Sequence, residues 1–421
     1  MRWFGGWEKQ LAPVPPHQGR PHYSRRTRPE QITAPKHGIL AKTVLDFTTP
    51  VRIIYRLVYA TPKARIGEEY MKTIVLAVFS LQGGGAERVV QTLARTMNAM
   101  GHQAHIVVFK DDIDHDLDPE VPIHRFPYRL WRSLPRKIRG KVAAMAFDRF
   151  VKKHIGVPDL VLSNLFPVDL ILSHSQLPNV HFIMHSTASH EYALGGQQNA
   201  ELEKLRRVYS GKKCVCVSKG VEEDMQALFG QSIETRTIYN PVEPALIQRQ
   251  ADEPVPPRKD YIVNVGKFKK AKRHDRLLHA YAQAKTPYDL LLVGTGPLLE
   301  ETKALAQSLG IADRVHFAGF QKNPFPLIKA AKFMVVSSEY EGLNMTILEA
   351  IALGVPVIST DCPSGPAEIL PTQNLVSPPD NIEALSARMT EASDNPERFR
   401  IDFPEKFDAK AVTRAYLSLS A

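Results

Sequence analysis

Cysteine is scarce in this chain, which has three cysteines among 421 residues. So small and odd a number provides no disulfide framework and is typical of a reducing compartment. Two of the three stand in the stretch CVC, at Cys214 and Cys216, which a strand would place on the same face. The other ligands that a zinc site needs are missing around them, so we expect no metal site.

Long apolar runs are missing too. No run of about 18 or more apolar residues occurs, so the sequence predicts no membrane-spanning helix. The apolar content of 43% is that of a globular protein, and 421 residues are too many for one ordinary core. We therefore expect two domains with additional segments.

Positive charge is unevenly distributed. Residues 1–70 hold 12 Lys/Arg and 5 Asp/Glu and so carry +7 of the net charge of +10, which leaves +3 for the rest. Within the rest, residues 127–154 hold nine basic residues and one acid. Such patches favour an anionic surface as partner. The chain has neither a nucleic-acid motif nor aromatic residues interleaved with the basic ones, so we expect no nucleic-acid partner.

The first 70 residues are rich in Pro, Arg and His and poorly periodic. They lack the apolar core of a signal peptide, and we expect a disordered tail or an upstream start, with folding from Met71 onward. The alternative is that residues 40–60 form a basic amphipathic segment, interrupted by Pro50.

From Met71 the sequence alternates apolar strands with helical stretches. The expected strands are TIVLAVF, HIVVF, DLVLSN, VHFIMHS and KCVCVS, and then YIVNVGKF, DLLLVGTG, VHFAGF, KFMVVSS and VPVIST. Continuous apolar strands separated by helices predict α/β domains with parallel sheets covered on both faces. The polar, Pro-rich residues 245–260 divide the two series. We expect one domain over 71–245, a second over 260–403, and a terminal helix in 404–421 that packs back on the first domain.

The stretch SSEYEGLNMTILEA places Glu341 just ahead of an expected helix and Glu349 about two turns beyond. Asn344 is a good N-cap for that helix, which we expect over 345–353. In open α/β sheets ligands bind beyond the carboxyl ends of strands, and free helix-start amides attract phosphate. Acids beside an anion site suit the hydroxyls of a sugar and a ribose. The layout therefore predicts a nucleotide-sugar site.

A diphosphate also needs cations and close backbone amides. Lys267 and Lys272 follow the strand YIVNV in VGKFKKAKRHD, where their ammonium groups would neutralise charge on a departing pyrophosphate. The loop QGGGAER at 82–88 brings Gly84 and Gly85 to a strand-to-helix turn, where backbone can approach a phosphate closely.

Taken together, the chain resembles the family-4 retaining glycosyltransferases of GT-B architecture, in which two Rossmann-like domains face a cleft. The matching pieces are GGGAERVV, VHFIMHS, CVSKGV, IYNPVE, VGKFKKAKRHD, LVGTGPLLEE, VHFAGF, SSEYEGLNMTILEA and GVPVISTDCPSGPAEIL. The resemblance covers roughly residues 71–421. It implies an enzyme that moves a sugar from a nucleotide-sugar donor, expected to be UDP-linked, to a glycan or lipid-linked acceptor in surface polysaccharide or lipopolysaccharide synthesis.

The resemblance also implies roles for particular residues. Glu341 would touch the transferred sugar and Glu349 the nucleotide ribose, while Lys267 and Lys272 would hold the diphosphate. The donor-binding amides would be those near Gly84 and Gly85 and those of Gly342, Leu343 and Asn344. His185 matches the family's active-site histidine. The leaving phosphate, and no protein nucleophile, would deprotonate the acceptor, and no metal or other cofactor is expected.

Three positions depart from the family pattern. Lys267 stands where arginine is usual, which gives a point charge in place of a bidentate fork. Ser186 follows His185 where Asp or Gly is frequent, and Asn344 replaces a small residue or proline. These differences leave the chemistry in place and blur the identity of the donor.

The basic stretch 127–154 has two interpretations. Ile138, Val142, Met145 and Phe150 fall near one helical face, so the segment could dock on anionic lipid. The membrane- or acceptor-binding candidates are Arg136, Lys137, Arg139 and Lys141. The alternative is a solvated basic helix face. With the lipid interpretation, the protein would be cytoplasmic and peripheral on the inner face of the plasma membrane.

Two other functions remain open from the sequence. A sugar-nucleotide 2-epimerase of GT-B architecture would release UDP without an acceptor. A non-enzymatic basic module would bind membrane and release no nucleotide. Neither the donor sugar, the acceptor, the linkage nor the oligomeric state can be inferred, because a fold does not define a product.

Overall fold

The computed structural model describes residues 65, 66, 69–82, 84–112, 118–131, 133–194, 200–254 and 259–420. The expectations for residues 1–64, including the amphipathic segment 40–60, lie outside this part of the chain. Just ahead of Met71, the two-residue strands β1 (Arg65–Ile66) and β2 (Glu69–Tyr70) pair antiparallel.

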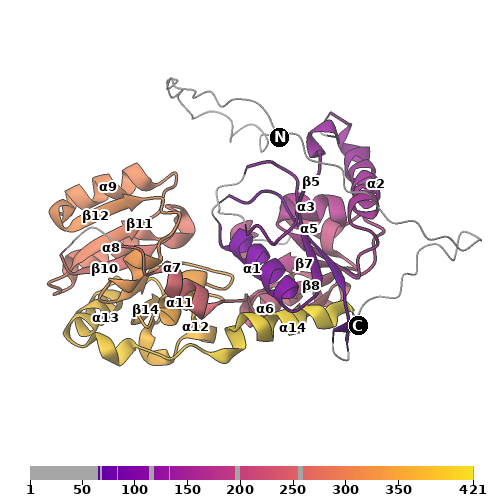
Figure 1. The fold of residues 1–421 in the computed structure, drawn as a ribbon. Coiled ribbons are helices and arrows are strands. Elements are labelled where there is room, and N and C mark those ends of the chain that lie inside the picture. Colours follow the sequence, from indigo (N-terminus) through magenta and orange to yellow (C-terminus); the bar gives the residue numbers. More distant parts are fainter. Residues whose placement is uncertain are drawn as a thin grey trace, which may run out of the picture. The chain divides into compact units, whose positions relative to one another are not determined.

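The first main sheet has seven parallel strands in the order β5-β4-β3-β6-β7-β8-β9. It lies in the indigo-to-magenta part of the ribbon in Figure 1. Its strands are β3 (Thr73–Val78), β4 (Gln103–Val108), β5 (Ile123–Arg125), β6 (Leu160–Asn164), β7 (Val180–Met184), β8 (Lys213–Cys216) and β9 (Glu234–Thr237). The central strands are continuous apolar runs, as parallel sheets covered on both faces require. In β3, for example, every residue from Ile74 to Val78 is fully buried.

Helices connect these strands and cover the sheet. They are α1 (Gly85–Ala99), α2 (Arg136–His154), α3 (Phe166–Leu172), α4 (Ala188–Glu191), α5 (Ala200–Tyr209), α6 (Lys219–Phe229) and α7 (Pro244–Gln250), with 3-10 segments η2 (Tyr128–Trp131) and η3 (Gly230–Ser232). Together with the first sheet they are called the N-terminal half below.

The second main sheet has six parallel strands in the order β12-β11-β10-β13-β14-β15. Its strands are β10 (Tyr261–Val265), β11 (Asp289–Val293), β12 (Val315–Gly319), β13 (Met334–Val336), β14 (Val357–Thr360) and β15 (Leu375–Val376). Its helices are α8 (His274–Gln283), α9 (Leu299–Ser308), α10 (Phe325–Lys329), α11 (Met345–Ala352), α12 (Pro366–Ile369) and α13 (Ile382–Asp394). The 3-10 segments are η4 (Lys270–Lys272), η5 (Ala312–Arg314), η6 (Thr372–Asn374), η7 (Pro396–Phe399) and η8 (Glu405–Phe407). These elements are called the C-terminal half.

The last helix, α14 (Ala409–Leu417), returns to the N-terminal half and is followed by η9 (Ser418–Ser420). Asp408 caps it by accepting from the amides of Lys410 and Ala411. The helix packs against α1, and the Lys72 ammonium donates to the carbonyl of Leu417 at 2.8 Å.

The predicted α/β fold with two parallel sheets is confirmed. Parallel pairing puts the carboxyl ends of all strands of a sheet on the same side, and the residues predicted for the site lie in the loops that follow these ends. His185 directly follows β7, Lys267 lies two residues beyond β10, and Glu341 lies in the loop between β13 and α11.

Candidate active site

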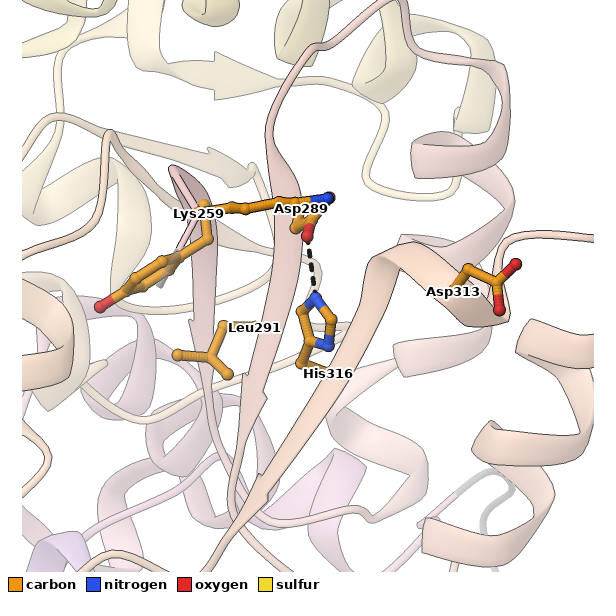
Figure 2. A pocket seen from close by; sticks show the side chains of 6 residues that line it. Lys259, Asp289, Leu291, Asp313 and His316 are labelled. Carbon is orange, nitrogen blue, oxygen red and sulfur yellow. Dashed lines mark hydrogen bonds and ion pairs between the residues drawn. The ribbon is translucent and has the colours of Figure 1, made fainter. Parts of the chain in front are cut away.

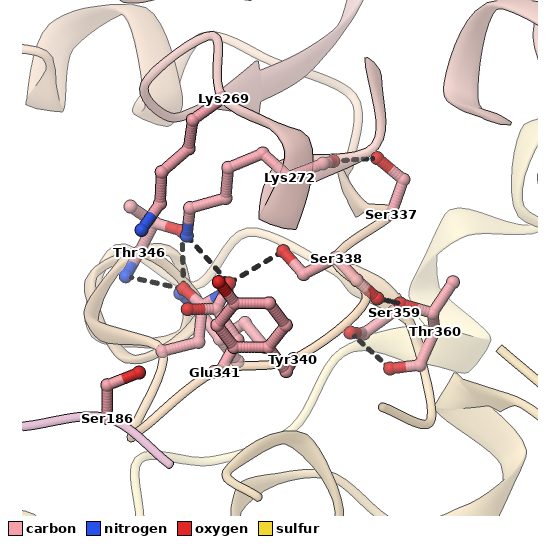
Figure 3. A network of polar contacts seen from close by, with 12 residues as sticks. Ser186, Lys269, Lys272, Ser337, Ser338, Tyr340, Glu341, Thr346, Ser359 and Thr360 are labelled. Carbon is pink, nitrogen blue, oxygen red and sulfur yellow. Dashed lines mark hydrogen bonds and ion pairs between the residues drawn. The ribbon is translucent and has the colours of Figure 1, made fainter. Parts of the chain in front are cut away.

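Glu341 and Lys272 form a close ion pair in the C-terminal half. The Lys272 ammonium lies 2.6 Å from Oε1 of Glu341, although 69 residues separate them in sequence (Figure 3). The same oxygen accepts from the Ser338 hydroxyl at 2.6 Å and from the Asn344 amide at 2.9 Å. Lys272 is held in turn because the Ser337 hydroxyl donates to its carbonyl. The network orients the carboxylate and leaves two donors of the ammonium for a ligand.

Asn344 has two functions in the loop. Its side-chain oxygen caps α11 by accepting from the amides of Thr346 and Ile347, at 3.1 and 3.4 Å. Its amide nitrogen meanwhile fixes Glu341. Because these two helix amides are already used, the amides available to an anion include those of Gly342, Leu343 and Asn344, ahead of the helix.

Glu349 lies two turns into α11 and is 3% exposed. Its Oε1 accepts from the Arg88 guanidinium, on α1 of the N-terminal half, at 2.9 Å. Its Oε2 is buried without a partner among the described residues. Burial raises the pKa of this carboxyl, and Arg88 acts in the opposite direction. A buried acid with one open acceptor is suited to a hydroxyl donor.

His185 comes within reach of the Glu341 loop. A Cβ on Gly342 would overlap the carbonyl of His185, so the two loops touch backbone to backbone there, and only glycine fits. The His185 Nε2 lies 2.9 Å from Oδ1 of Asn164, whose amide nitrogen donates to Ala77 and Leu162 carbonyls. Burial lowers the pKa of His185 to about 4. The ring is therefore neutral, with its proton on Nε2 and an acceptor at Nδ1.

The glycine loop at 82–88 and Lys267 are linked through the carboxylate of Glu87. A Cβ on Gly84 would overlap the Glu87 carboxylate, which folds back over the start of α1, and Gly85 lies near Met345 of α11. Burial raises the pKa of Glu87, and the charge of the exposed Lys267 opposes that effect. The structure thus brings a carboxylate to the loop where the sequence predicted amides for phosphate.

A cavity of about 430 Å³ opens beside Glu349. It is lined from the N-terminal half by Arg88, Gln91, Thr92 and Arg95, and from the C-terminal half by Gln321, Lys322, Phe325, Met345 and Glu349, among others. Its position between α1 and α11 gives it the room and the polar groups for a nucleoside.

A smaller cavity, of about 260 Å³, lies toward the amino ends of the strands of the C-terminal sheet (Figure 2). Asp289 at the start of β11 accepts from His316 of β12 at 2.9 Å there, with Lys259 and Asp313 nearby. Since these residues precede or begin their strands, they lie away from the carboxyl ends that carry Glu341 and Lys267.

The four basic candidates lie apart from this site, on α2, which packs against α3 and η2. Lys137 and Lys141 are exposed, whereas the Arg139 guanidinium donates to the carbonyl of Leu134 and so supports the preceding turn. The side chain of Arg136 lies outside the described residues. The single apolar face expected from the sequence is divided: Ile138 and Met145 are exposed, and Phe150 packs against Phe126.

Sequence reasoning missed three residues of the site: Arg88, Asn164 and Glu87. Arg88 and Glu87 stand in the motif QGGGAER, of which only the glycines are predicted to bind the donor. Their polar character at the first turns of a helix that follows a Gly-rich loop was the available signal. Asn164 ends a buried strand, and a polar residue at that position also points to the ligand edge of a sheet.

The described residues contain neither a metal-binding cluster nor a membrane-spanning helix. Among the residues described, no group of three or more His, Cys, Asp or Glu side chains could hold a metal ion. Within the same residues no helix is both long and apolar enough to cross a membrane.

Comparison with known proteins identifies the class. Residues 83–246 match the model of Glycosyltransferase Family 4, and residues 248–411 match that of Glycosyl transferases group 1. Together the matches cover most of the chain, with the whole second sheet and every strand of the first sheet except β3. The chain therefore belongs to the GT-B glycosyltransferases of the family-4 type, as the sequence predicted.

Two of the relatives are named for transfer to a lipid-linked or a lipopolysaccharide acceptor. An N-acetylgalactosaminyltransferase of Campylobacter jejuni, named for a diphospho-undecaprenol acceptor, is 26% identical over 71% of this chain and 83% of its own. The lipopolysaccharide 1,6-galactosyltransferase of Escherichia coli is 33% identical over 37% of this chain, which spans less than half (45%) of that relative. Among solved structures, the Anabaena protein HepE in complex with UDP and glucose has a TM-score of 0.63 at 16% identity, over 83% of this chain and 97% of its own.

Proposed function

We propose that this glycosyltransferase moves a sugar, with retention of its anomeric configuration, from a UDP-sugar to a lipid-linked or lipopolysaccharide acceptor in surface-glycan synthesis. The observation that carries the proposal is the Lys272–Glu341 pair at the start of α11, with the buried Glu349 on the same helix. The names of the relatives support the acceptor class, and the UDP bound to HepE supports the donor.

In this proposal the diphosphate lies at the loop before α11. The ammonium groups of Lys272 and Lys267 and the amides of Gly342, Leu343 and Asn344 stabilise the charge that develops as the nucleotide leaves. Lysines then supply the neutralisation that a metal provides in other enzymes. We expect activity, measured as UDP release, to persist in excess EDTA. If EDTA abolishes activity and added Mg²⁺ restores it, the metal-free role of the lysines is contradicted.

Glu341 and His185 would contact the transferred sugar. Three hydrogen bonds converge on Oε1 of Glu341, which makes this oxygen a poor nucleophile and leaves Oε2 for a sugar hydroxyl. The neutral His185 offers Nδ1 as a second acceptor. In this proposal Oε2 of Glu341 binds a sugar hydroxyl and forms no bond to the anomeric carbon, and the leaving phosphate oxygen is the base that takes the acceptor proton on the same face.

In this proposal α2 contacts the membrane surface that carries the acceptor. Its exposed face carries Lys137, Lys141, Arg149, Lys152 and Lys153 with the apolar Ile138 and Met145. The acid of this helix, Asp148, points inward and accepts from Ser175 and Gln176. An exposed face with basic and apolar residues and no acid suits an anionic lipid surface.

Sedimentation with vesicles containing anionic lipid tests this membrane contact. We expect binding at low salt that falls as salt rises, and weaker binding of the double variant Lys137→Glu, Lys141→Glu. The variant Lys303→Glu, Lys329→Glu, with one half-buried and one exposed lysine of the C-terminal half, is the charge-matched control. Equal binding of both variants, or no binding at low salt, would remove the membrane contact from the proposal.

The central test measures UDP release from a panel of UDP-sugars, with and without lipid-linked and lipopolysaccharide acceptors. Acceptor-dependent release supports the transfer reaction, and acceptor-free release would indicate the epimerase alternative. Analysis of the product's anomeric configuration by NMR then decides between retention and inversion.

Substitution of the two acids separates their roles. Glu341→Ala should lower kcat by about a hundredfold or more, with little change in UDP affinity, because its contact would be to the sugar. Glu349→Ala should mainly weaken UDP binding. Glu339→Ala, two residues from Glu341 and paired with Arg273 at 3.6 Å, is the control. Negligible effects of both site substitutions would overturn the site assignment.

A further inference from the structure

The contact between Arg88 and Glu349 joins the two halves of the molecule across the larger cavity. Arg88 comes from the second turn of α1 and Glu349 from α11, 261 residues further on. The guanidinium is 27% exposed and the carboxylate 5%, so the acid relies on this cation in a nearly dry environment. Arg88 also lies over the Phe325 ring, 5.4 Å from its centroid, which holds the guanidinium in place.

The geometry of the pair leaves it incomplete. A carboxylate and a guanidinium that pair for stability alone tend to form two parallel hydrogen bonds. Here one nitrogen of Arg88 meets one oxygen of Glu349, and Oε2 is buried without a partner among the described residues. Leaving such an acceptor unpaired is costly unless a ligand satisfies it. Both residues line the cavity, so a hydroxyl bound there is the natural donor.

We propose that Arg88 is a positioning residue of the donor site: it holds Oε1 of Glu349 and so presents Oε2 to a ribose hydroxyl of the nucleotide sugar. This inference rests on the proposed donor function of the same cavity. Arg88 acts through Glu349, and because it comes from the other half of the molecule, the ribose subsite is complete only when the two halves meet.

Among the described charges, Arg88 is the cation that pairs with Glu349. Besides α1, the elements packed against α11 are β13, β14, α7, α10 and α12. The α7 residue Gln248 donates to the carbonyl of Ala352, and Arg249 is exposed. On α10, Lys329 pairs with Asp252, and on α12, Glu368 accepts from backbone amides of Lys219 and Gly220. Arg88 is thus the charge that counters the burial of Glu349.

The test compares nucleotide affinity in a double-mutant cycle on the full chain. Calorimetry first determines which of UDP, GDP and ADP binds the unmodified protein most tightly, and that nucleotide is the probe. Arg88→Met and Glu349→Gln should each weaken its binding by about tenfold to a hundredfold. The double variant should be within about twofold of Glu349→Gln alone, because Arg88 acts through that carboxylate.

The dependence on pH distinguishes this role from a structural one. Without the cation, Glu349 keeps its proton to higher pH, so the affinity of Arg88→Met should recover as pH rises. Arg314→Met is the matched control. Its guanidinium also pairs with an acid, Asp289, and lies over an aromatic ring, that of Tyr281, but at the far edge of the C-terminal sheet.

The outcomes separate the two proposals. If Glu349→Gln weakens binding but Arg88→Met does not, or if their losses simply add, the role of Arg88 is wrong and the donor site stands. If none of the three nucleotides binds the unmodified protein, the proposed function fails and this inference fails with it. Arg314→Met should bind within about twofold of the unmodified protein at every pH.

Discussion

His185 shows how one neighbouring amide can set the chemistry of a side chain. The side-chain amide nitrogen of Asn164 donates to the carbonyls of Ala77 and Leu162, and these bonds orient the amide. The amide oxygen therefore faces the imidazole and fixes the ring proton on Nε2. Burial then keeps the ring neutral, with its pKa near 4. A neutral histidine can accept a hydrogen bond from a sugar hydroxyl at Nδ1, which a charged one cannot do.

Asn164→Asp tests this arrangement. A carboxylate beside the ring would favour the imidazolium and raise its pKa toward or above the usual value of about 6.5. In the unmodified enzyme we expect kcat/KM to show no titration of His185 between about pH 5.5 and 8. In the variant, kcat/KM should fall by roughly tenfold from pH 8 to pH 6. NMR of the ring nitrogens reports the protonation directly, and an unchanged neutral ring in the variant would contradict the account.

Asp169 is a buried acid outside the site. It accepts from Ser163 at 2.5 Å and from Tyr209 at 2.7 Å, and burial raises its pKa from 3.8 to about 7. Between these values the folded chain holds a proton that the unfolded chain has lost. The group therefore stabilises the fold at low pH, and this contribution is lost as pH rises from about 4 through 7.

Asp169→Asn removes that titration. The free energy of unfolding of the variant, minus that of the unmodified protein, should increase by on the order of 2–3 kcal/mol as pH rises from 5 to 8. Urea unfolding followed by circular dichroism at both pH values measures the difference. A difference that stays constant with pH would show that Asp169 does not titrate in this range.

At the scale of elements, the loop between β13 and α11 carries most of the candidate site. It provides Glu341, the cap Asn344 and the glycine on which the His185 carbonyl rests. The loop is short, so a displacement of its backbone moves all three together.

Gly342→Ala should displace that loop. The added Cβ would overlap the carbonyl of His185, and relief requires the two loops to separate. We expect kcat/KM to fall by about a hundredfold, since small misplacements of reacting groups have large effects, with far-UV circular dichroism unchanged. Steady-state kinetics checks this, and near-normal kcat/KM would mean that the contact between the loops is dispensable.

The strands that sequence reasoning missed are all at sheet edges. β5 and β9 flank the first sheet, and β15 ends the second. The residues of β9, ETRT, alternate between half-buried and exposed, and β15 has two residues. An edge strand is solvated on one side and need not be an apolar run, so the signal that identified the central strands is absent.

At the scale of the whole molecule, Glu368 links the halves. Its two oxygens accept from the amides of Lys219 and Gly220, at 2.9 and 3.0 Å, at the start of α6. The Ser218 and Ser364 hydroxyls lie 2.6 Å apart beside them. An acid at a helix start is favourably placed with respect to the helix dipole.

Glu368→Gln should loosen this link. The amide keeps the shape of the side chain but retains one acceptor oxygen and loses the charge, so one of the two backbone amides loses its partner. We expect hydrogen exchange in a peptide covering 217–221 to speed up by about tenfold, measured by mass spectrometry. Glu383→Gln, an acid in the first turn of α13, is the control. Equal exchange in both variants would argue against a link through Glu368.

The sequence by itself determined the fold class and the local part of the candidate site. Apolar runs specify central strands because burial is a property of the residues themselves, and Glu341, Asn344 and Glu349 lie on one loop and helix whose periodicity places them. Only the tertiary structure decided which partners meet them. Lys272 reaches Glu341 across 69 residues, Arg88 reaches Glu349 across 261, and Glu368 reaches α6 across nearly 150. The physical reason is that such contacts depend on how sheets and loops pack, and no local pattern records which distant charge arrives.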